Sequence, residues 1–551
     1  MPDTILIFSL GPVQGFLAEA RRAQDLWAGS RLLSELTQAA IQACRRSGAE
    51  MIYPADPSQE SLPNKFVVKL PEGVAPEQAA EAARQAAQEE LQQRGEVARQ
   101  FLQSIIPSDS VWEKIWQRQL GNHLEFFWAA AVIEDDYPAA YQKASRAFDA
   151  AKRARTFQQV TEDGLKDSLS GRRSALRTAQ GDARSYWNRI AASGRVTAAQ
   201  LKPEGRERLD ALGAIKRFGF GNEAERFPST SSVAAADYLE KVRGKHQSAL
   251  VAYREILKAI PKFYCVRGSE AWPYDGDLLY LETLVPERLR TSYGFGDADL
   301  QQYEGQLEAA RLALRMLYNS IGRPSPYYAL LVMDGDSMGK RVASCASEEE
   351  HRQLSQRLVS FAAQARQIVE QHQGTAVYAG GDDVLALLPL KRALPAAQAL
   401  AEAFAKIVPG GTASAGLAFA HHLYPLDAVL RAAREAEGWA KGMEGKNAIC
   451  VRALKRSGEP IEVRSHWGDL RTLFGELCQW FACGALSSRF AYEAAANLPF
   501  LDGEPVQSEL KRLIQRHWDT RKSNPPDPDN LAKQLVAWAD SLPGKAEELT
   551  D

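Results

Sequence analysis

Short apolar runs and longer amphipathic segments alternate in a regular order along this chain. The run TILIFSL at 4–10 is typical of a buried strand, and the apolar spacing within 11–43 is mostly helical. The N-terminal part therefore has the predicted order strand, helix, strand, strand, helix, strand. Its strands are predicted at 4–10, 50–54, 64–70 and 124–133, and its helices within 11–43 and at 76–103.

The same order of elements returns in the second half of the chain. The predicted elements are a strand at 327–336, a helix at 347–372, hairpin arms at 374–381 and 383–390, a helix at 392–408 and a strand at 411–420. Two β-α-β-β-α-β units predict an α+β fold with two ferredoxin-like domains.

The remaining segments read as helical. Residues 136–320 are polar, helix-rich and punctuated by glycine, and the pattern after residue 461 is helical apart from the loop SNPPDPDN at 523–530. Four domains are therefore predicted: 1–135 (first ferredoxin-like), 136–320 (helical insert), 321–460 (second ferredoxin-like) and 461–551 (C-terminal helical).

Composition narrows the class of protein. The net charge of -2 gives no overall basic field for nucleic acid, and the six cysteines include no C-x-x-C pair. The N-terminus lacks the basic region of a signal peptide, and no apolar run reaches the length of a membrane span. These features predict a soluble, cytoplasmic protein. The local basic run at 171–189 is typical of a solvated helix face.

Carboxylates follow two strands of the second predicted unit. Asp334 ends the first strand, while Asp382 and Asp383 lie at the tip of the predicted hairpin. Because the first helix of such a unit returns the chain parallel to its first strand, both strand ends meet at one edge of the sheet. Three carboxylates there would raise each other's pKa, and Mg²⁺ or Mn²⁺ would relieve the repulsion. The sequence therefore predicts a site for one or two metal ions that act on a phosphate.

Residues around these carboxylates suit a nucleotide. Two glycines before them permit a tight turn, the segment GDSMGK opens a helix with free N–H groups, and two lysines follow the last helix of the unit, where they could reach the phosphates. The predicted nucleotide-binding residues are Gly335, Asp336, Ser337, Met338, Gly339, Gly380, Gly381, Lys441 and Lys446. The alternative interpretation is an ordinary hairpin turn, a helix N-cap at Asp336 or Ser337, and two solvated lysines.

Several of these motifs resemble a known family. The segments PYYALLVMDGDSMGK (326–340) and YAGGDDVLAL (378–387) resemble the second palm domain of the large subunit of type III CRISPR effector complexes. The stretch GPVQGFLAEARRAQDLWAGSRLLSEL (11–36) and the motif FPSTSSVA (227–234) are similar to the Cmr branch, type III-B. The resemblance covers about residues 4–450 and makes the ferredoxin-like units two polymerase/cyclase palms.

The resemblance implies an activity and partners. Family members bind two ATP molecules between the palms, and the 3′-hydroxyl of one attacks the α-phosphate of the other to make cyclic oligoadenylate. The implied partners are other Cmr subunits, guide RNA and target RNA, which triggers synthesis. By this resemblance, Asp334 and Asp382 are metal ligands and Asp383 is a ligand or a support.

Two departures from the family pattern stand out. No His-Asp dipeptide occurs in the sequence, so the HD nuclease of many family members is expected to be absent. The family's zinc ribbon has two cysteine knuckles, but this chain has Asp167, Ser170, Asp210 and Gly213 at the cysteine positions. Since Ser and Gly cannot replace thiolates on zinc, a degenerate ribbon without zinc is expected.

Other functions stay open at this point. AMP could be joined to another acceptor, such as S-adenosylmethionine. A free-standing diguanylate cyclase fits less well because of the Gly-Gly-Asp-Asp ending and the second palm. A non-catalytic scaffold is disfavoured by the retained aspartates, which a dead site would not need.

Overall fold

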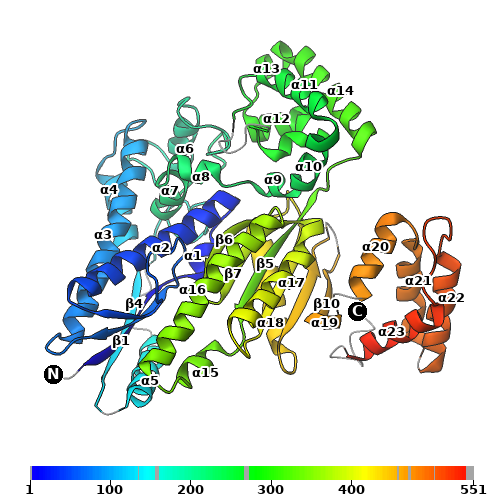
Figure 1. Ribbon diagram of the computed structural model, residues 1–551. Coiled ribbons are helices and arrows are strands. Elements are labelled where there is room, and N and C mark those ends of the chain that lie inside the picture. Colours follow the sequence, from blue (N-terminus) through cyan, green and yellow to red (C-terminus); the bar gives the residue numbers. More distant parts are fainter. Residues whose placement is uncertain are drawn as a thin grey trace.

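The computed structural model describes residues 3–134, 136–154, 161–265, 272–455, 458–469, 473–501 and 503–541. Two sheets lie side by side at its centre, with a helical insert at one end and a helical C-terminal part beyond the second sheet (Figure 1). No helix among the described residues combines the length and the apolar character needed to cross a membrane.

The first sheet and its helices form what we call the first unit. Its elements are β1 (Thr4–Gly11), α1 (Gln14–Ala18), α2 (Ala23–Arg46), β2 (Glu50–Tyr53), β3 (Lys65–Leu70), α3 (Pro76–Gln103), α4 (Ser110–Gly121) and β4 (Glu125–Val132). The strand order β2-β3-β1-β4, with antiparallel neighbours throughout, is that of a ferredoxin-like fold, as predicted.

Helices cover both faces of this first sheet. Leu6 and Phe8 of β1 pack in the core that includes α2 and α3, while Ile5 and Ile7 pack on the other side against α5 (Tyr137–Ala154). Strand β1 is therefore buried along its whole length. The domain boundary predicted at residue 135 falls before α5, although α5 packs on this sheet.

The second sheet and its helices form the second unit. Its elements are β5 (Tyr327–Gly335), α15 (Met338–Ala343), α16 (Glu348–Gln371), β6 (Thr375–Gly380), β7 (Asp383–Pro389), α17 (Leu390–Ile407), β8 (Ala413–His421), α18 (Leu426–Gly442), β9 (Ala448–Ala453) and β10 (Ile461–His466). The strand order is β10-β9-β8-β5-β7-β6, so β8-β5-β7-β6 repeats the arrangement of the first sheet.

One face of the second sheet points toward the first unit. Helices α16 and α17 cover the opposite face, where they pack on Leu331 and Met333 of β5. Tyr328 and Leu330 instead share one core with α2 of the first unit and with α18. The two units are thus joined by a continuous hydrophobic core.

Residues 461–466 form strand β10, so the helical structure predicted directly after residue 461 is wrong for this segment. The segment alternates Ile461 and Val463 with charged residues, which is the two-residue period of a strand, and it pairs antiparallel with β9. Glu462 lies between Arg464 and Arg452, at 2.7 and 3.7 Å. The second sheet therefore continues past the predicted boundary at residue 460.

Helices make up most of the described insert and C-terminal part. Helices α6 (Ala183–Ala191), α7 (Ala211–Phe218), α8 (Asn222–Arg226) and α9 (Thr230–Ala234) join the core of the first unit. A separate core holds α10 (Ala236–Lys245), α11 (Gln247–Lys258), α12 (Pro286–Tyr293) and α14 (Glu304–Ile321), with α13 (Asp297–Gln302) beside them. The C-terminal helices are α19 (Trp467–Asp469), α20 (Gly475–Cys483), α21 (Arg489–Asn497), α22 (Glu504–His517) and α23 (Pro528–Ser541).

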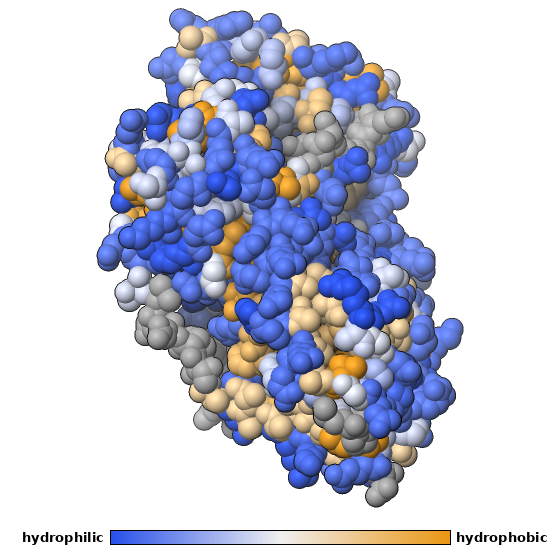
Figure 2. Space-filling model, turned by 90° about the vertical axis from the view of Figure 1, so that its left-hand side faces the viewer, coloured by the Kyte–Doolittle hydropathy of each residue, from blue (hydrophilic) through white to orange (hydrophobic). Residues whose placement is uncertain are grey.

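One face of the outer surface is mostly polar. The face seen in Figure 2 is largely hydrophilic, with hydrophobic residues in smaller groups. In the basic run at 171–189, Arg184 and Arg189 of α6 are exposed, as expected for a solvated helix face, whereas residues 171–182 precede the helix and the Arg173 side chain is only 21% exposed.

Candidate functional site

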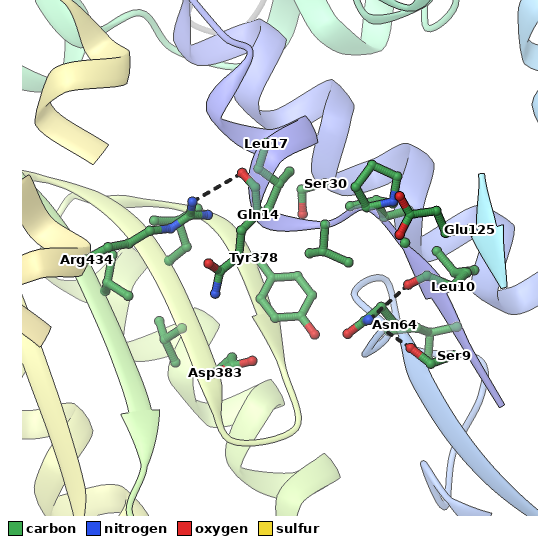
Figure 3. Close-up of a pocket in the computed structure, with 18 of the residues that line it drawn as sticks. Ser9, Leu10, Gln14, Leu17, Ser30, Asn64, Glu125, Tyr378, Asp383 and Arg434 are labelled. Atoms are coloured by element: carbon green, nitrogen blue, oxygen red, sulfur yellow. Dashed lines mark hydrogen bonds between the residues drawn. The ribbon is translucent and has the colours of Figure 1, made fainter. Parts of the chain in front are cut away.

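A cavity of about 490 Å³ lies between the two units (Figure 3). The first unit contributes the end of β1 and the start of α1, together with Ser30, Asn64 and Glu125. The second unit contributes Tyr378, Asp383 and Arg434 as well as apolar residues of β5 and β7. This volume suits a small-molecule ligand, since ligand pockets usually measure about 300–1,000 Å³.

The Gly-Gly-Asp-Asp segment forms the predicted hairpin. Gly380 pairs with Asp383, so Gly381 and Asp382 make the two-residue turn between β6 and β7. Gly381 has a φ of +65°, and a Cβ there would lie 2.7 Å from the Tyr53 hydroxyl of the first unit. Glycine is thus required both by the turn and by the close approach of the first unit.

The end of β5 meets this turn, as the topology predicts. A Cβ at Gly335 would lie 2.9 Å from Cβ of Asp382 and 2.8 Å from the Phe404 ring. The end of β5, which carries Asp334, and the β6–β7 turn, which carries Asp382 and Asp383, are therefore adjacent. Any larger residue at position 335 would push the turn away from β5.

Asp334 and Asp383 project from the face of the sheet that borders the cavity. Asp334 follows Val332, a cavity residue, by two positions, and Asp383 precedes Leu385, another cavity residue, by two. Side chains two apart on a strand lie on the same face. Figure 3 shows Asp383 at the second-unit end of the cavity.

Helix α18 places three charged residues opposite these carboxylates. Arg434, Glu437 and Lys441 are spaced so that they share one face of the helix. Arg434 donates to the Gln14 carbonyl of the first unit at 3.2 Å, shown as a dashed line in Figure 3. Lys441 contacts Asp334 and lies 2.6 Å from Glu437 Oε1.

The neighbouring carboxylates of Asp382 and Asp383 repel each other when both are ionised. Burial raises the pKa of Asp382, to about 6. The pKa of Asp383 is also raised, first by burial among surrounding protein atoms and then by the charges of Asp382 and Glu437, although its side chain reaches the cavity solvent. A divalent cation near these groups would relieve the repulsion.

The three aspartates do not yet form a complete metal site. Among the described residues, no three His, Cys, Asp or Glu side chains are arranged to hold a metal ion. Asp334 is bonded to Lys441 instead. The donors still fit Mg²⁺ or Mn²⁺ in chemistry, because all three are carboxylates and they lie at one edge of the sheet. Asp334 would have to leave Lys441 to join them.

Asp336 does not have the free carboxylate that a ligand contact would need. Its oxygens accept hydrogen bonds from Thr412 Oγ1 and Ser414 Oγ, both at 2.8 Å, and from the Asn447 backbone N–H at 3.0 Å. Asp336 is also 6% exposed. It therefore ties β5 to β8 and to the loop before β9, and this agrees poorly with the nucleotide contact predicted for it.

The other predicted residues occupy several environments. Met338 is buried in the core of the second unit, whereas Gly339 has open space around it. Ser337 has a φ of +56° and precedes α15, and Lys446 Nζ donates to its Oγ at 3.3 Å. Helix α15 begins at Met338, within the segment GDSMGK that is predicted to open a helix, but it has only six residues.

Several residues in and around the cavity are not among those predicted from the sequence. Arg434 and Glu437 carried a signal, since they share the helical spacing of Lys441. Asn64 donates to Ser9 Oγ at 3.2 Å and to the Leu10 carbonyl at 3.0 Å, which fixes the wall of the first unit. Neither Asn64, which lines the cavity, nor Tyr53, which contacts the turn at Gly381, could be found from spacing, because only the packing of the two units brings them to the site.

The predicted degenerate knuckles do come together. Asp167 accepts from the backbone N–H groups of Leu169 and Ser170 at 2.8 and 2.7 Å, and Asp210 accepts from that of Gly213 at 2.6 Å. The Arg173 guanidinium bridges Asp210 and Glu19 of the first unit. An arginine therefore supplies the positive charge in this part of the insert.

Comparison with known proteins gives two family matches. Residues 327–450 match the family described as Cas10/Cmr2, second palm domain, and residues 5–96 match the family described as CRISPR-associated protein Cmr2, N-terminal. The CRISPR system Cmr subunit Cmr2 of Pyrococcus furiosus is 28% identical over 281 residues. That match covers 44% of this chain and 32% of the relative, so it spans about a third of the relative's length.

Solved structures show the same fold. A chain in the cryo-EM structure of type III-B Cmr-beta in its apo state has a TM-score of 0.64 at 14% identity, covering 96% of this chain and 78% of that one. A chain of Cmr-beta bound to cognate target RNA has a TM-score of 0.61 at 15% identity, covering 96% and 80%. As the sequence predicts, the chain resembles the large palm-containing subunit of type III-B CRISPR complexes, Cmr2.

Proposed function

We propose that this chain is a nucleotidyltransferase that uses ATP and joins AMP to an acceptor held in the cavity between the two units. The observation that carries the proposal is the cavity itself, which is lined by Asp383 of the acidic turn and Arg434 of α18 at one end and by the first unit at the other. The product that the resemblance to type III CRISPR palm subunits implies is cyclic oligoadenylate.

The cavity supports a division of labour between the units. Asp334, Asp382 and Asp383 would hold Mg²⁺ or Mn²⁺, which would activate the attacking hydroxyl and stabilise the leaving pyrophosphate. Arg434 and Lys441 provide positive charge for the phosphates of the donor ATP. The polar and apolar wall of the first unit would hold the acceptor.

We further propose that the chain works inside a type III-B CRISPR complex. The relatives named above are a Cmr subunit and chains of Cmr-beta assemblies, one of them with cognate target RNA. The implied partners are other Cmr subunits, guide RNA and target RNA. Target binding would favour the arrangement of the two units that aligns hydroxyl and α-phosphate.

Mass spectrometry of the products tests the proposal. The assembled complex is incubated with ATP and Mg²⁺, with a complementary or a mismatched RNA, and with or without S-adenosylmethionine. Cyclic oligoadenylate made only with complementary RNA is the expected result. An AMP adduct that appears only with S-adenosylmethionine would change the acceptor, and the absence of any nucleotide product would leave a scaffold.

A further inference from the structure

Lys441 contacts a carboxylate that the proposed reaction needs for a metal ion. Its ammonium group touches Asp334 Oδ2 and lies 2.6 Å from Glu437 Oε1. No other cation contacts Asp334 among the residues that the structure describes. The protein alone therefore neutralises Asp334 with its own lysine.

This contact competes with a metal ion. A carboxylate oxygen bonded to an ammonium group has less negative charge to offer, and the ammonium group repels a divalent cation placed beside it. The side chains of Lys441 and Asp334 are only 27% and 28% exposed, so water screens this repulsion incompletely. In this arrangement Asp334 is paired with Lys441, and the three aspartates form no metal-binding group among the described residues.

A bound triphosphate would change the competition between Lys441 and a metal ion for Asp334. Lysine has a flexible four-carbon stem, so its ammonium group can turn from one anion to another over several ångströms. Lys441 lies in the last turn of α18, on the helix face that carries Arg434 toward the cavity. Phosphate oxygens in the cavity would give Lys441 a third anionic partner, besides Asp334 and Glu437, and would let the lysine leave Asp334.

We propose that Lys441 blocks metal binding by Asp334 until a nucleoside triphosphate draws the lysine away. The inference rests on the proposed nucleotidyl transfer and adds an order to it, in which the nucleotide completes the metal site. Lys441 is then a positioning residue, because it acts through Asp334. The alternative is a permanent ion pair that only fastens α18 to β5.

Metal binding without nucleotide separates the two interpretations. The full chain is titrated with Mn²⁺, and free Mn²⁺ is followed by electron paramagnetic resonance. Lys441→Met keeps the stem and removes the charge, so it is expected to tighten Mn²⁺ binding by about 5- to 150-fold, the usual range of coupling between two sites. Lys391→Met, which removes an exposed lysine at the start of α17, is expected to bind as the wild type does.

The double variant Asp334→Asn/Lys441→Met shows whether the gain passes through Asp334. The gain should disappear, because the ligand that Lys441 releases is gone. A gain that persists in the double variant, or Lys441→Met binding no tighter than the wild type, would overturn the proposal. If thermal melting shows that Lys441→Met is unfolded, Lys441→Gln is titrated in its place with the same expectations.

Failure of the proposed function would look different. If the wild-type complex makes no nucleotide product while Lys441→Met still gains Mn²⁺ affinity through Asp334, the role of Lys441 stands and the reaction is wrong. If products form and Lys441→Met gains nothing, the reaction stands and the inference about Lys441 fails.

Discussion

The four strands of the first sheet and the matching four strands of the second have the same order, but the residues at the corresponding sheet edge differ. Strand β5 ends in Asp334-Gly335 and the β6–β7 connection is a two-residue turn with carboxylates. Strand β1 ends in Leu10-Gly11, and a long connection at 54–64 joins β2 to β3. One fold can therefore present the proposed metal and phosphate site in one copy and the wall of a cavity in the other.

The difference in connection length has a structural consequence. The short turn of the second unit packs under Tyr53 and the 54–64 connection of the first. A Cβ at Gly380 would lie 3.1 Å from the Ser61 carbonyl, and the Ala379 N–H donates to Ser61 Oγ at 3.4 Å. The longer connection of the first unit thus packs against the shorter turn of the second unit.

The largest effect is expected from removing the carboxylates that distinguish the two units. Asp382→Ala/Asp383→Ala in the assembled complex should lower product formation by more than about 100-fold, the upper end of what loss of a supporting residue costs a metal site. Asp56→Ala, in the connection of the first unit, is the matched control and should retain activity. Mass spectrometry measures the products, and normal turnover by the double variant would refute the assigned site.

The next largest effect, on the melting temperature, is expected from adding a methyl group where the β6–β7 turn contacts the first unit. Gly381→Ala puts a methyl group at a φ of +65° and 2.7 Å from the Tyr53 hydroxyl, whereas Gly73→Ala puts one at +88° with nothing within 4 Å. Both variants pay the backbone cost of about 1–2 kcal/mol, so Gly381→Ala should melt at a lower temperature than Gly73→Ala. Thermal unfolding measures both, and Tyr53→Phe should restore part of the difference. Equal melting temperatures would mean that the turn is not held by the first unit.

The raised pKa of Asp382 predicts a smaller effect on pH dependence. A carboxyl group whose pKa is about 6 when folded and near 3.9 when unfolded binds its proton more tightly in the folded state, so its contribution to stability is lost as the pH rises from about 4 to 6. Without divalent cation, Asp382→Asn should therefore melt higher than the wild type at pH 7.5, by about 2–4 °C, the shift that about 1 kcal/mol gives a domain of 150–250 residues.

This gain in melting temperature should shrink at pH 4.5, where the wild-type carboxyl group is protonated as well. Asp56→Asn is the control, since the pKa of Asp56 is lowered by its hydrogen bonds with Ser58 and should give the opposite sign. A gain for Asp382→Asn that is the same at both pH values would count against a titrating Asp382.

The smallest effect is expected in the insert that follows the first unit. Because Arg173 supplies the charge beside Asp210, a chelator should leave the melting temperature of the full chain unchanged. Elemental analysis of the purified chain should find no stoichiometric zinc. One zinc per chain, or a melting temperature that falls with chelator, would show that the knuckles bind metal after all.

Much of the fold follows from the sequence, and the limits have physical causes. The order of strands and helices in both units is readable because apolar periodicity is strong there. Strand β10 was assigned to the helical tail because the short segment IEVRSH carries a weak signal beside long helices. Helix α5 was assigned to the insert because sequence shows its length but not which sheet covers its apolar face.

The sequence predicts which backbone segments meet at the candidate site, but not the contacts of their side chains. Topology alone brings the end of β5 to the β6–β7 turn, and the contact of Gly335 with Asp382 follows from it. The pairing of Asp334 with Lys441 and the saturated hydrogen bonds of Asp336 depend on side-chain directions and on neighbouring strands. Such contacts are set by tertiary packing, which no local pattern encodes.

The core shared by both units decides how the chain can be divided for experiments. Tyr328, Leu330, Leu385 and Leu387 of the second sheet are packed together with α2 of the first unit. A fragment that starts near residue 321 would present this apolar face to water and would be prone to aggregate. Fragments for crystallisation or binding assays should therefore keep the first unit and its insert attached to the second sheet.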